Sequence, residues 1–483
     1  MPGLTTLHTI PSEILDHTLI FCRPQDVSRF SQTCKKYLDL VYNGDQFLWR
    51  GLFLSIWDDP RRAWNPRKMV NSDPLKITQE YNWKDSLIYR FKTLQVIHST
   101  EEDWSLTDAL ETLLLILSES LPYEDEVGPS LNNISYNIIW LEKIIPDSPF
   151  LTSHTLDTSQ RQLRAQLRMY LGLSFQLDSH SSSSSSPSTA SSPNPRRSAR
   201  LNSRWTRTSI RSESRCFVYD LRNYVSKTLW GPYRINVEGQ LVVNWEHIEH
   251  IANVIQFNMK EINAPWNLLC PIYSLELTRP FSAPRAENRI EIDPSEFVVD
   301  DWAGIEGTWA RFISFMDYRE LFAFNFVQFG SHPTRQPSFF DDHQIEEAAR
   351  LIEMQVKIIS DPLDTSVPFA PSIPSLGEED PNYPPIRFKG TARGTGGVQT
   401  NNAEVRGSVY RYKNGLIRYF IVTYYDGVGQ WRTAFSAEGV QLGGIQSAMG
   451  IAGIWTGADH DDGDPAGPFM MWKVSKPVLG SSS

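Results

Sequence analysis

The segment from Tyr410 to Phe435 constrains the fold more than any other part of this 483-residue chain. It consists of three runs rich in apolar and aromatic residues, interrupted first by Asn414-Gly415 and then by Asp426-Gly427. Asn-Gly and Asp-Gly readily adopt the positive φ angles that two-residue β-turns require. The pattern therefore predicts a meander of three antiparallel strands.

Further stretches in the second half of the chain have the length and composition of β-strands. They are Thr308 to Phe326, Leu351 to Ile359, Ile386 to Arg393, Gly450 to Thr456 and Phe469 to Val474. With the meander they give seven or eight antiparallel strands without long helices between them. Because closure removes the exposed edges of a sheet, we expect an up-and-down β-barrel.

The first half of the chain has a helical period instead. Apolar residues recur at three- and four-residue steps from Leu106 to Leu117, from Ile134 to Ile145 and from Leu163 to Leu171. A further helix is expected over residues 244–260, with Asn244 as its N-cap. The expected fold class is therefore α+β and multidomain, with N-terminal helices, a helical middle region and a C-terminal antiparallel up-and-down β-barrel.

Two breaks in composition divide the chain. Residues 179–195 are mostly serine and proline, with little apolar surface to offset the entropy of ordering, and seven arginines follow up to Arg215. Seven prolines in residues 361–385 indicate an extended loop. We expect an N-terminal three-helix segment at 5–54, a helical spacer at 55–177, a disordered Ser/Arg-rich insertion at 178–215, a mixed helix and strand connection at 216–296, and the barrel at 297–476.

Composition and charge narrow the classes of protein. The formal net charge of −10 argues against nucleic-acid binding over the whole surface. The arginine-rich stretch from Arg196 to Arg215 is nevertheless locally positive. No apolar run approaches the roughly 18 residues of a membrane helix, and no signal segment follows Met1. The cysteines lack the spacing of a zinc site or a disulfide framework. We expect a protein of the cytoplasm, the nucleus or both, without membrane contact.

The first fifty or so residues predict three short helices. The first contains Ile14 and Leu15 and has Pro11 in its opening turn. The second has Val27, Phe30, Cys34 and Leu38 on one face, and a third would be capped by Asp45 and carry Leu48, Trp49, Leu52 and Phe53. Three helices of this length bury little surface, so we expect a partner or a following domain to complete them.

The order of these residues closely resembles an F-box. The positions that define the resemblance are Ile10-Pro11, Glu13, Ile14-Leu15, Asp26-Val27, Cys34 and Leu48-Trp49. The resemblance implies that residues 8–53 bind the Skp-type adaptor of a cullin-based SCF ubiquitin ligase, by insertion of an apolar helix face into a groove. The implied contact residues are Ile10, Pro11, Ile14, Leu15, Leu19, Val27 and Trp49. Alternatively these side chains form a local core, for which Cys34 and Trp49 are the best candidates.

The second half carries two weaker resemblances. Gly307-x-Trp309 is similar to the Gly-x-Trp that begins the first strand of lipocalin-type barrels. The whole arrangement resembles fungal F-box proteins, through Gln441 to Gly444, Trp455 to His460 and Gly467 to Phe469. The arrangement is also similar, more distantly, to animal F-box receptors whose C-terminal barrel captures a degradation signal on the target. That similarity implies that the barrel holds a protein target for ubiquitin transfer by other subunits, so that the chain itself is not an enzyme. The lipocalin-like motif favours an alternative, a small-ligand carrier or sensor.

Candidate target-binding residues follow from the strand pattern alone. They are Asp317, Tyr318, Arg319, Trp431, Arg432 and Trp455. On a strand Asp317 and Arg319 would point to the same face, where they would contact a peptide or pair with each other. Tryptophan in a barrel lines the mouth or belongs to the core. Both alternatives remain open for each group.

Patterns for catalysis or metal binding are weak. Asp459 to Asp464 departs from the EF-hand spacing and indicates a polar turn. His247 and His250 lack a third ligand, and the neighbouring Glu246 and Glu249 indicate a solvated helix face. No phosphate-binding loop is present in the sequence. We therefore predict no cofactor, no metal and no catalytic residue.

Overall fold

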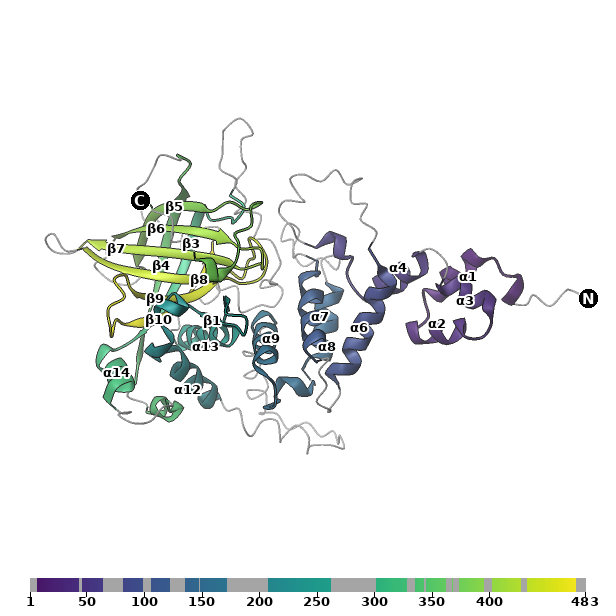
Figure 1. The fold of residues 1–483 in the computed structure, drawn as a ribbon, viewed down its shortest axis with the longest axis horizontal. Coiled ribbons are helices and arrows are strands. Elements are labelled where there is room, and N and C mark those ends of the chain that lie inside the picture. Colours follow the sequence, from purple (N-terminus) through teal and green to yellow (C-terminus); the bar gives the residue numbers. More distant parts are fainter. Residues whose placement is uncertain are drawn as a thin grey trace, which may run out of the picture. The chain divides into compact units, whose positions relative to one another are not determined.

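A computed structural model gives the fold of the chain (Figure 1). It describes residues 7–42, 46–63, 81–98, 106–121, 135–146, 148–171, 207–261, 301–327, 335–342, 345–361, 367, 373–394, 402–426 and 432–474. The chain divides into two compact units, residues 1–122 with 129–160, and residues 123–128 with 161–483. The predicted α+β class with a C-terminal β-barrel is confirmed. No helix in the described ranges has the length and apolar character needed to cross a membrane.

The first unit begins with short helices. They are η1 (Leu7–Thr9), α1 (Ser12–Leu19), α2 (Pro24–Ser31), α3 (Lys35–Tyr42), α4 (Phe47–Leu54) and η2 (Pro60–Arg62). The single helix expected to run from Val27 to Leu38 is therefore two helices. The hydroxyls of Ser31 and Thr33 donate to the carbonyls of Ser28 and Phe30, at 2.6 and 2.7 Å. Such bonds compete with helical ones and favour ending α2 here. The expected cap Asp45 lies outside the described residues.

The remaining helices of the first half follow the apolar period. They are α6 (Trp83–Ile97), α7 (Leu106–Ser118), α8 (Tyr136–Ile144), η5 (Pro149–Leu151) and α9 (Thr158–Tyr170). Asn82 and Ser135 cap α6 and α8, since their side-chain oxygens accept hydrogen bonds from the backbone N–H groups of Asp85 and Ile138. The helices predicted around Leu110, Ile138 and Leu167 are thus confirmed.

One buried carboxylate joins distant parts of the first unit. Asp58 is 2% exposed and accepts hydrogen bonds from Tyr136 N at 2.8 Å, Leu121 N at 3.0 Å and Ser135 Oγ at 2.5 Å. Its own backbone N–H donates to Asn137 Oδ1 at 3.0 Å. Asp58 therefore fixes the turn after α4 against the end of α7 and the start of α8.

The second unit contains a closed antiparallel barrel of eight strands in the order β10-β3-β4-β5-β6-β7-β8-β9. The strands are β3 (Gly307–Met316), β4 (Glu347–Ile358), β5 (Ile386–Gly394), β6 (Asn402–Arg411), β7 (Ile417–Asp426), β8 (Arg432–Gln441), β9 (Ile451–Gly457) and β10 (Ala466–Lys473). Each strand pairs with its neighbours in sequence, and β10 closes the ring by pairing with β3, with Trp309 opposite Lys473. The predicted up-and-down topology is confirmed.

The hairpin between β6 and β7 differs in detail from the predicted turn. The loop has three residues, Lys413, Asn414 and Gly415, because Tyr412 N donates to Leu416 O at 2.9 Å. Gly415 has φ +87°, whereas Asn414 is absent from the residues with positive φ. A type I turn followed by a left-handed glycine has this geometry. The predicted two-residue turn, with positive φ at both residues, is therefore wrong, although the hairpin forms as predicted.

The strand expected from Thr308 to Phe326 ends early. β3 stops at Met316, and the chain continues as α14 (Tyr318–Phe322), a π-helical segment (Ala323–Val327) and, later, η12 (Pro337–Asp341). Asp317 is the N-cap of α14, with Oδ1 accepting from Arg319 N at 2.8 Å. The aromatic run after Asp317 therefore satisfies its hydrogen bonds within a helix.

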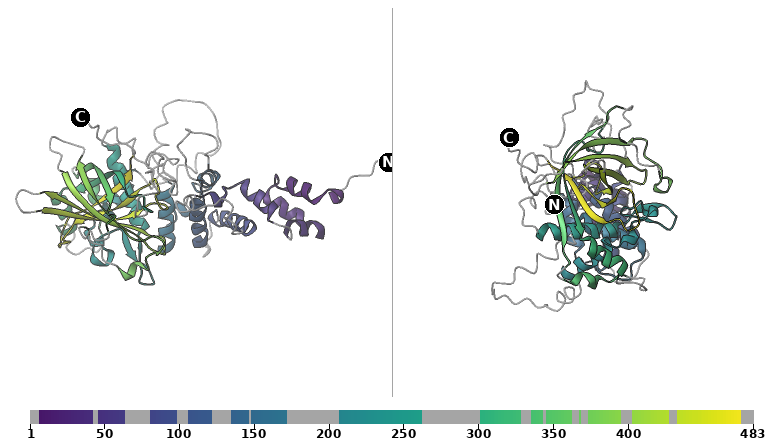
Figure 2. Two further views of the ribbon diagram at one scale, coloured as in Figure 1. Left: turned by 90° about the horizontal axis from the view of Figure 1, so that it is seen from above. Right: turned by 90° about the vertical axis from the view of Figure 1, so that its left-hand side faces the viewer.

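Two helices pack beside the barrel in the second unit, α12 (Arg207–Val218) and α13 (Trp245–Glu261). Figure 1 and Figure 2 show them on one side of it, and α13 contacts the outer faces of β3, β9 and β10. The connection between them holds η6 (Leu221–Asn223), η7 (Ser226–Thr228), β1 (Tyr233–Ile235) and β2 (Leu241–Val243), and η13 (Pro374–Leu376) lies between β4 and β5. Residues 207–215 were expected to be disordered but are helical, and residues 178–206 lie outside the described ranges.

Replacing Asp58 by asparagine tests the importance of the buried carboxylate. The amide offers one oxygen instead of two and leaves buried donors without acceptors, which costs about 3 kcal/mol. We expect a clear fall in the melting temperature followed by circular dichroism at 222 nm. Asp59→Asn is the matched control, because Asp59 pairs with the partly exposed Arg61 and such pairs contribute at most about 1 kcal/mol. Equal melting temperatures for the two variants would contradict this role of Asp58.

Candidate functional site

The N-terminal helices separate the predicted adaptor contacts into two groups. Ile14 is 55% exposed, Pro11 is exposed and Ile10 is half-buried. The others are buried in the chain itself: Leu15, Leu19, Val27 and Trp49. The indole N–H of Trp49 also donates to Val41 O at 2.8 Å. These four side chains form the core of the helical segment, as the alternative of a local core described, and their contact with a partner stays a prediction.

Several exposed apolar side chains of the same segment were not singled out as contacts from the sequence. They are Leu7, Phe21, Leu38 and Phe47, and Phe21 is 90% exposed. Single exposed apolar residues are common on protein surfaces. Here Leu38 and Phe47 lie on α3 and α4, Leu7 lies on η1, and Phe21 lies in the turn between α1 and α2. The N-terminal helices thus combine a filled core with apolar side chains that face outward.

The interior of the barrel, here called the lumen, is filled by apolar side chains from all eight strands. One buried cluster contains Trp309, Met354, Phe388, Val405, Tyr419, Ala437, Ile451, Phe469 and Met471. The segment before β3 closes one end of the lumen, where Trp309 Nε1 donates to Ile305 O at 2.8 Å and Trp302 Nε1 donates to Pro384 O at 2.7 Å. Lys473 Nζ holds the same segment through Gly304 O at 2.8 Å.

The opposite end of the lumen, here called the open end, is lined by half-buried side chains. They are Ile313, Tyr425, Phe435 and Trp455. The ring of Phe435 packs edge-to-face against Tyr425 and Trp455, at centroid distances of 6.0 and 5.6 Å. Trp455 therefore packs against Phe435 and also lines the open end. Its Nε1 donates to Ser314 O at 3.2 Å.

The other residues predicted at the mouth are only partly described. Trp431 lies outside the described residues, and of Arg432 only the backbone is described. Arg432 pairs with Asp426 at the start of β8, which places its backbone at the open end. The structure therefore brings the backbone of Arg432 and the side chain of Trp455 to the same end of the barrel, and their contact with a target stays a prediction.

Arg311 lies in the lumen, on the face of β3 that carries Trp309 and Ile313. It is 5% exposed, and its Nη1 donates to Thr423 Oγ1 at 3.4 Å. Since β3 and β7 lie four places apart in an eight-strand ring, the side chain crosses the lumen to the facing wall. The guanidinium also lies 4.6 Å from the centroid of the Phe469 ring, and its Nε has no hydrogen-bond partner.

Burial lowers the pKa of Arg311 to about 10, with the Tyr425 phenol as the one opposing influence. Among the described residues no carboxylate pairs with this guanidinium. Arg418 makes the contrast, on the outward face of β7. It binds Glu438 in a bidentate manner, with Nε to Oε2 at 2.9 Å and Nη2 to Oε1 at 2.5 Å, and Tyr233 OH donates to the same carboxylate at 3.3 Å. Although burial opposes it, this ion pair raises the pKa of Arg418.

The predicted residues Asp317, Tyr318 and Arg319 are exposed, but they do not lie on a strand. Tyr318 instead begins a row of exposed aromatic side chains at four-residue steps, with Phe322 and Phe326. Successive ring centroids are 6.5 and 4.9 Å apart. We call this row the aromatic ridge. Its members are 57, 46 and 52% exposed, so it is an apolar surface of the second unit.

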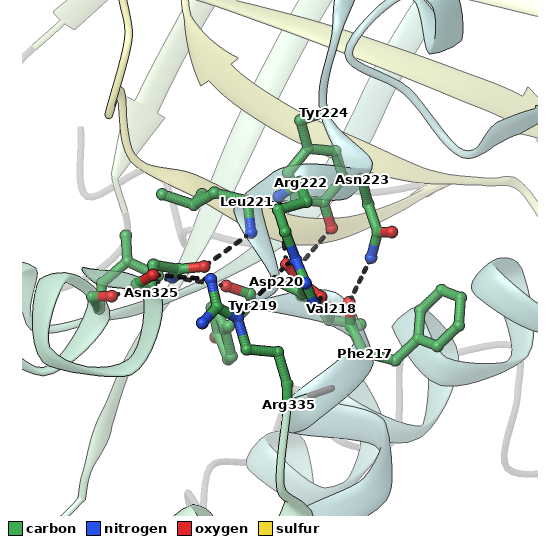
Figure 3. A network of polar contacts seen from close by, with 11 residues as sticks. Phe217, Val218, Tyr219, Asp220, Leu221, Arg222, Asn223, Tyr224, Asn325 and Arg335 are labelled. Carbon is green, nitrogen blue, oxygen red and sulfur yellow. Dashed lines mark hydrogen bonds and ion pairs between the residues drawn. The ribbon is translucent and has the colours of Figure 1, made fainter. Parts of the chain in front are cut away.

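A polar network fixes the segment that carries the ridge (Figure 3). Asn325 Oδ1 accepts from Leu221 N at 3.0 Å, and its Nδ2 donates to Tyr219 O at 2.9 Å. Arg335 Nη2 donates to Asn325 O at 2.6 Å, and its Nε lies 3.8 Å from Asp220 Oδ1. These contacts hold the π-helical segment against the residues that follow α12, so the network fixes the position of the ridge.

His247 and His250 do not lie on a solvated helix face, so that prediction is wrong. His247 is 1% exposed, and its Nε2 lies 3.0 Å from Tyr224 OH. His250 stacks on Phe217, with Nδ1 at 3.1 Å from Ser214 Oγ. Burial and the neighbouring His250 lower the pKa of His247 to about 3. The described part of the chain contains no cluster of His, Cys, Asp and Glu that would hold a metal.

Comparisons with known proteins give no identification. No protein-family model matches the chain, and neither the curated proteins nor the solved structures include a significant match. The candidate sites therefore rest on the geometry above. They are the exposed N-terminal apolar residues, the aromatic ridge and the lumen around Arg311.

The two buried arginines of the barrel, Arg311 and Arg418, are expected to respond differently to replacement by methionine. Arg418→Met leaves Glu438 buried and unpaired, which costs about 3–5 kcal/mol and lowers the melting temperature by on the order of 10 °C. Arg311→Met removes a charge that has no carboxylate partner in the described part of the chain, so we expect an unchanged or higher melting temperature. Differential scanning calorimetry of both variants measures this. A fall for Arg311→Met as large as that for Arg418→Met would show that Arg311 is an essential part of the fold.

His247 gives a prediction for acid stability. The pKa of His247 is about 3 in the fold and about 6.5 in the unfolded chain. Between these two pH values the unfolded chain therefore binds a proton at this residue that the folded chain does not bind. Stability is therefore fully present above about pH 6.5 and falls as the pH is lowered, by about 2 kcal/mol between pH 7 and pH 5. We expect His247→Gln to be less stable at pH 7 but to lose less on acidification. An equal fall in melting temperature from pH 7 to pH 5 in the unmodified protein and in His247→Gln would contradict this role.

Proposed function

We propose that the chain is the substrate-recruiting subunit of an SCF-type ubiquitin ligase in the cytoplasm or nucleus. In this proposal the N-terminal helices bind the Skp-type adaptor, which links the chain to the cullin. The observation that carries the proposal is the separation of roles within the F-box-like pattern. Leu15, Val27 and Trp49 fill the core of the helical segment, while Ile14 and Pro11 remain on its surface.

The energetics are consistent with such an interface. Covering an exposed Ile, Leu or Phe side chain contributes about 1.5–3 kcal/mol before the costs of association. The exposed residues Leu7, Ile14 and Phe21 give the segment several such anchors. A few buried anchors usually supply most of the affinity at an interface of this kind.

The second unit would bind the protein target. The aromatic ridge of Tyr318, Phe322 and Phe326 supports this, because exposed aromatic side chains on a fixed segment are typical of protein-binding surfaces. The chain would contribute proximity between target and ubiquitin-transferring subunits, and no catalytic residue of its own.

A second candidate function is a carrier or sensor of a small ligand, with the barrel as its binding domain. The specific observation in its favour is Arg311, a lumen guanidinium without a carboxylate partner among the described residues. The two candidates differ in their partners, since one requires an adaptor protein and the other requires only the barrel.

The adaptor proposal is tested by replacing one exposed residue. We expect Ile14→Asp in the full chain to weaken capture of a Skp-type adaptor by about tenfold or more, because a desolvated carboxylate would face the groove. Pull-down followed by biolayer interferometry measures the dissociation constant. The matched control is Ile139→Asp, which changes an isoleucine of similar exposure, 48% against 55%, on α8.

Two results would contradict the proposal. One is the absence of adaptor binding by the unmodified chain, and the other is an equal loss of binding in Ile14→Asp and Ile139→Asp. The melting temperature of each variant shows whether the fold is retained, and surface substitutions of this kind are expected to change stability by less than about 0.5 kcal/mol.

A further inference from the structure

We propose that the lumen of the barrel binds the carboxylate of a small organic acid, with Arg311 and Thr423 as its ligands and the apolar part of the acid at the open end. The proposal concerns the barrel alone and does not depend on adaptor binding.

The first step of the argument is the state of the Arg311 charge. A guanidinium that is taken out of water without a counter-charge destabilises a fold by several kcal/mol, and buried charges are usually paired. Arg311 has a long hydrogen bond to Thr423, a contact with the Phe469 ring and an Nε without a partner. Within the described ranges these contacts leave the charge without a counter-charge. Arg418 shows that the same barrel pairs the charge of another deeply buried arginine with a carboxylate, through Glu438.

The second step is the chemistry of the missing partner. A guanidinium presents its N–H donors in a planar fork that matches a carboxylate. The hydroxyl of Thr423 lies beside the Arg311 fork, and Tyr425 follows on the same face of β7. Hydroxyl groups donate to the remaining lone pairs of an anion. A carboxylate satisfies this set of donors.

The third step is access. The segment from Trp302 to Ile305 caps the other end of the lumen and is buried there. At the open end, Ile313, Phe435 and Trp455 are half-buried, so solvent reaches the side chains that separate Arg311 from the outside. The ligand would enter here with its charged group first. Its apolar part would then lie against these side chains.

The fourth step is size. An eight-stranded barrel has an interior that side chains fill or that holds one small ligand. The buried cluster fills the lumen on both sides of Arg311, since Trp309 lies away from the open end while Phe469 pairs with Ile313 on the open-end side. The ligand is therefore a short acid rather than a bulky one, because only its carboxylate reaches past the aromatic side chains of the mouth.

Binding of sodium octanoate to the full chain tests the proposal by isothermal titration calorimetry, below the concentration at which octanoate forms micelles. We expect saturable binding at one site, and a dissociation constant raised at least about tenfold by Arg311→Met. Arg393→Met is the control, because Arg393 is exposed on the outward face of β5, and it should bind octanoate as the unmodified chain does. Thr423→Val provides an independent variant and should weaken binding by several-fold.

Octan-1-ol and formate separate the contributions of tail and charge. We expect octan-1-ol to bind equally weakly to the unmodified chain and to Arg311→Met, and formate to bind more weakly than octanoate. The proposal is overturned if octanoate does not bind, if Arg311→Met and Thr423→Val both bind it unchanged, or if octan-1-ol binds as tightly as octanoate. Formate binding as tight as that of octanoate would overturn the apolar part of the proposal. An adaptor-binding defect would not alter any of these results.

Discussion

Closure of the barrel through the pairing of β10 with β3 is the constraint on which the rest of the second unit depends. Once the ring is closed, successive residues of each strand face the lumen and the outside of the barrel in alternation. Arg311 then faces inward with no carboxylate partner among the described residues, whereas Arg418 faces outward and binds Glu438. The same alternation presents the outer faces of β3, β9 and β10 to α13. Several polar side chains of α13, such as Asn253 and Asn258, are buried. One backbone arrangement thus produces both a stabilising ion pair and an unpaired charge.

Much of the fold could be predicted because it depends on local patterns. The Gly415 hairpin and the apolar period around Leu110 require only neighbouring residues, so the strands and helices appear where the sequence places them. The end of β3 was missed because the aromatic run after Asp317 suits a strand as well as a helix, and the capping bond to Arg319 decides between them. The break after Ser31 was missed for a similar reason, since hydroxyl bonds to nearby carbonyls end a helix that the apolar spacing would continue.

The candidate sites were harder to predict because burial depends on distant contacts. Glu246 and Glu249 made the face of His247 look solvated, yet Glu249 forms an ion pair with Arg168 of α9, and both side chains are largely buried. Ile14 and Leu15 are adjacent in the sequence, but only the packing of α1 decides which of them remains exposed. Arg311 carried a usable signal, because strand alternation places it on the same face as Trp309, where an arginine is unexpected. Only the closed barrel shows that no carboxylate of the described residues faces Arg311 across the lumen.

The closure of the ring also determines the order in which the barrel can assemble. Trp309 and Lys473 are paired in the fold, although nearly the whole length of the barrel sequence separates them. During synthesis from the N-terminus, the faces of β3 to β9 that line the lumen stay open until β10 has emerged. Such non-local pairing slows folding and prolongs the exposure of apolar surface. We therefore expect the barrel to depend on protection from aggregation while it is being made.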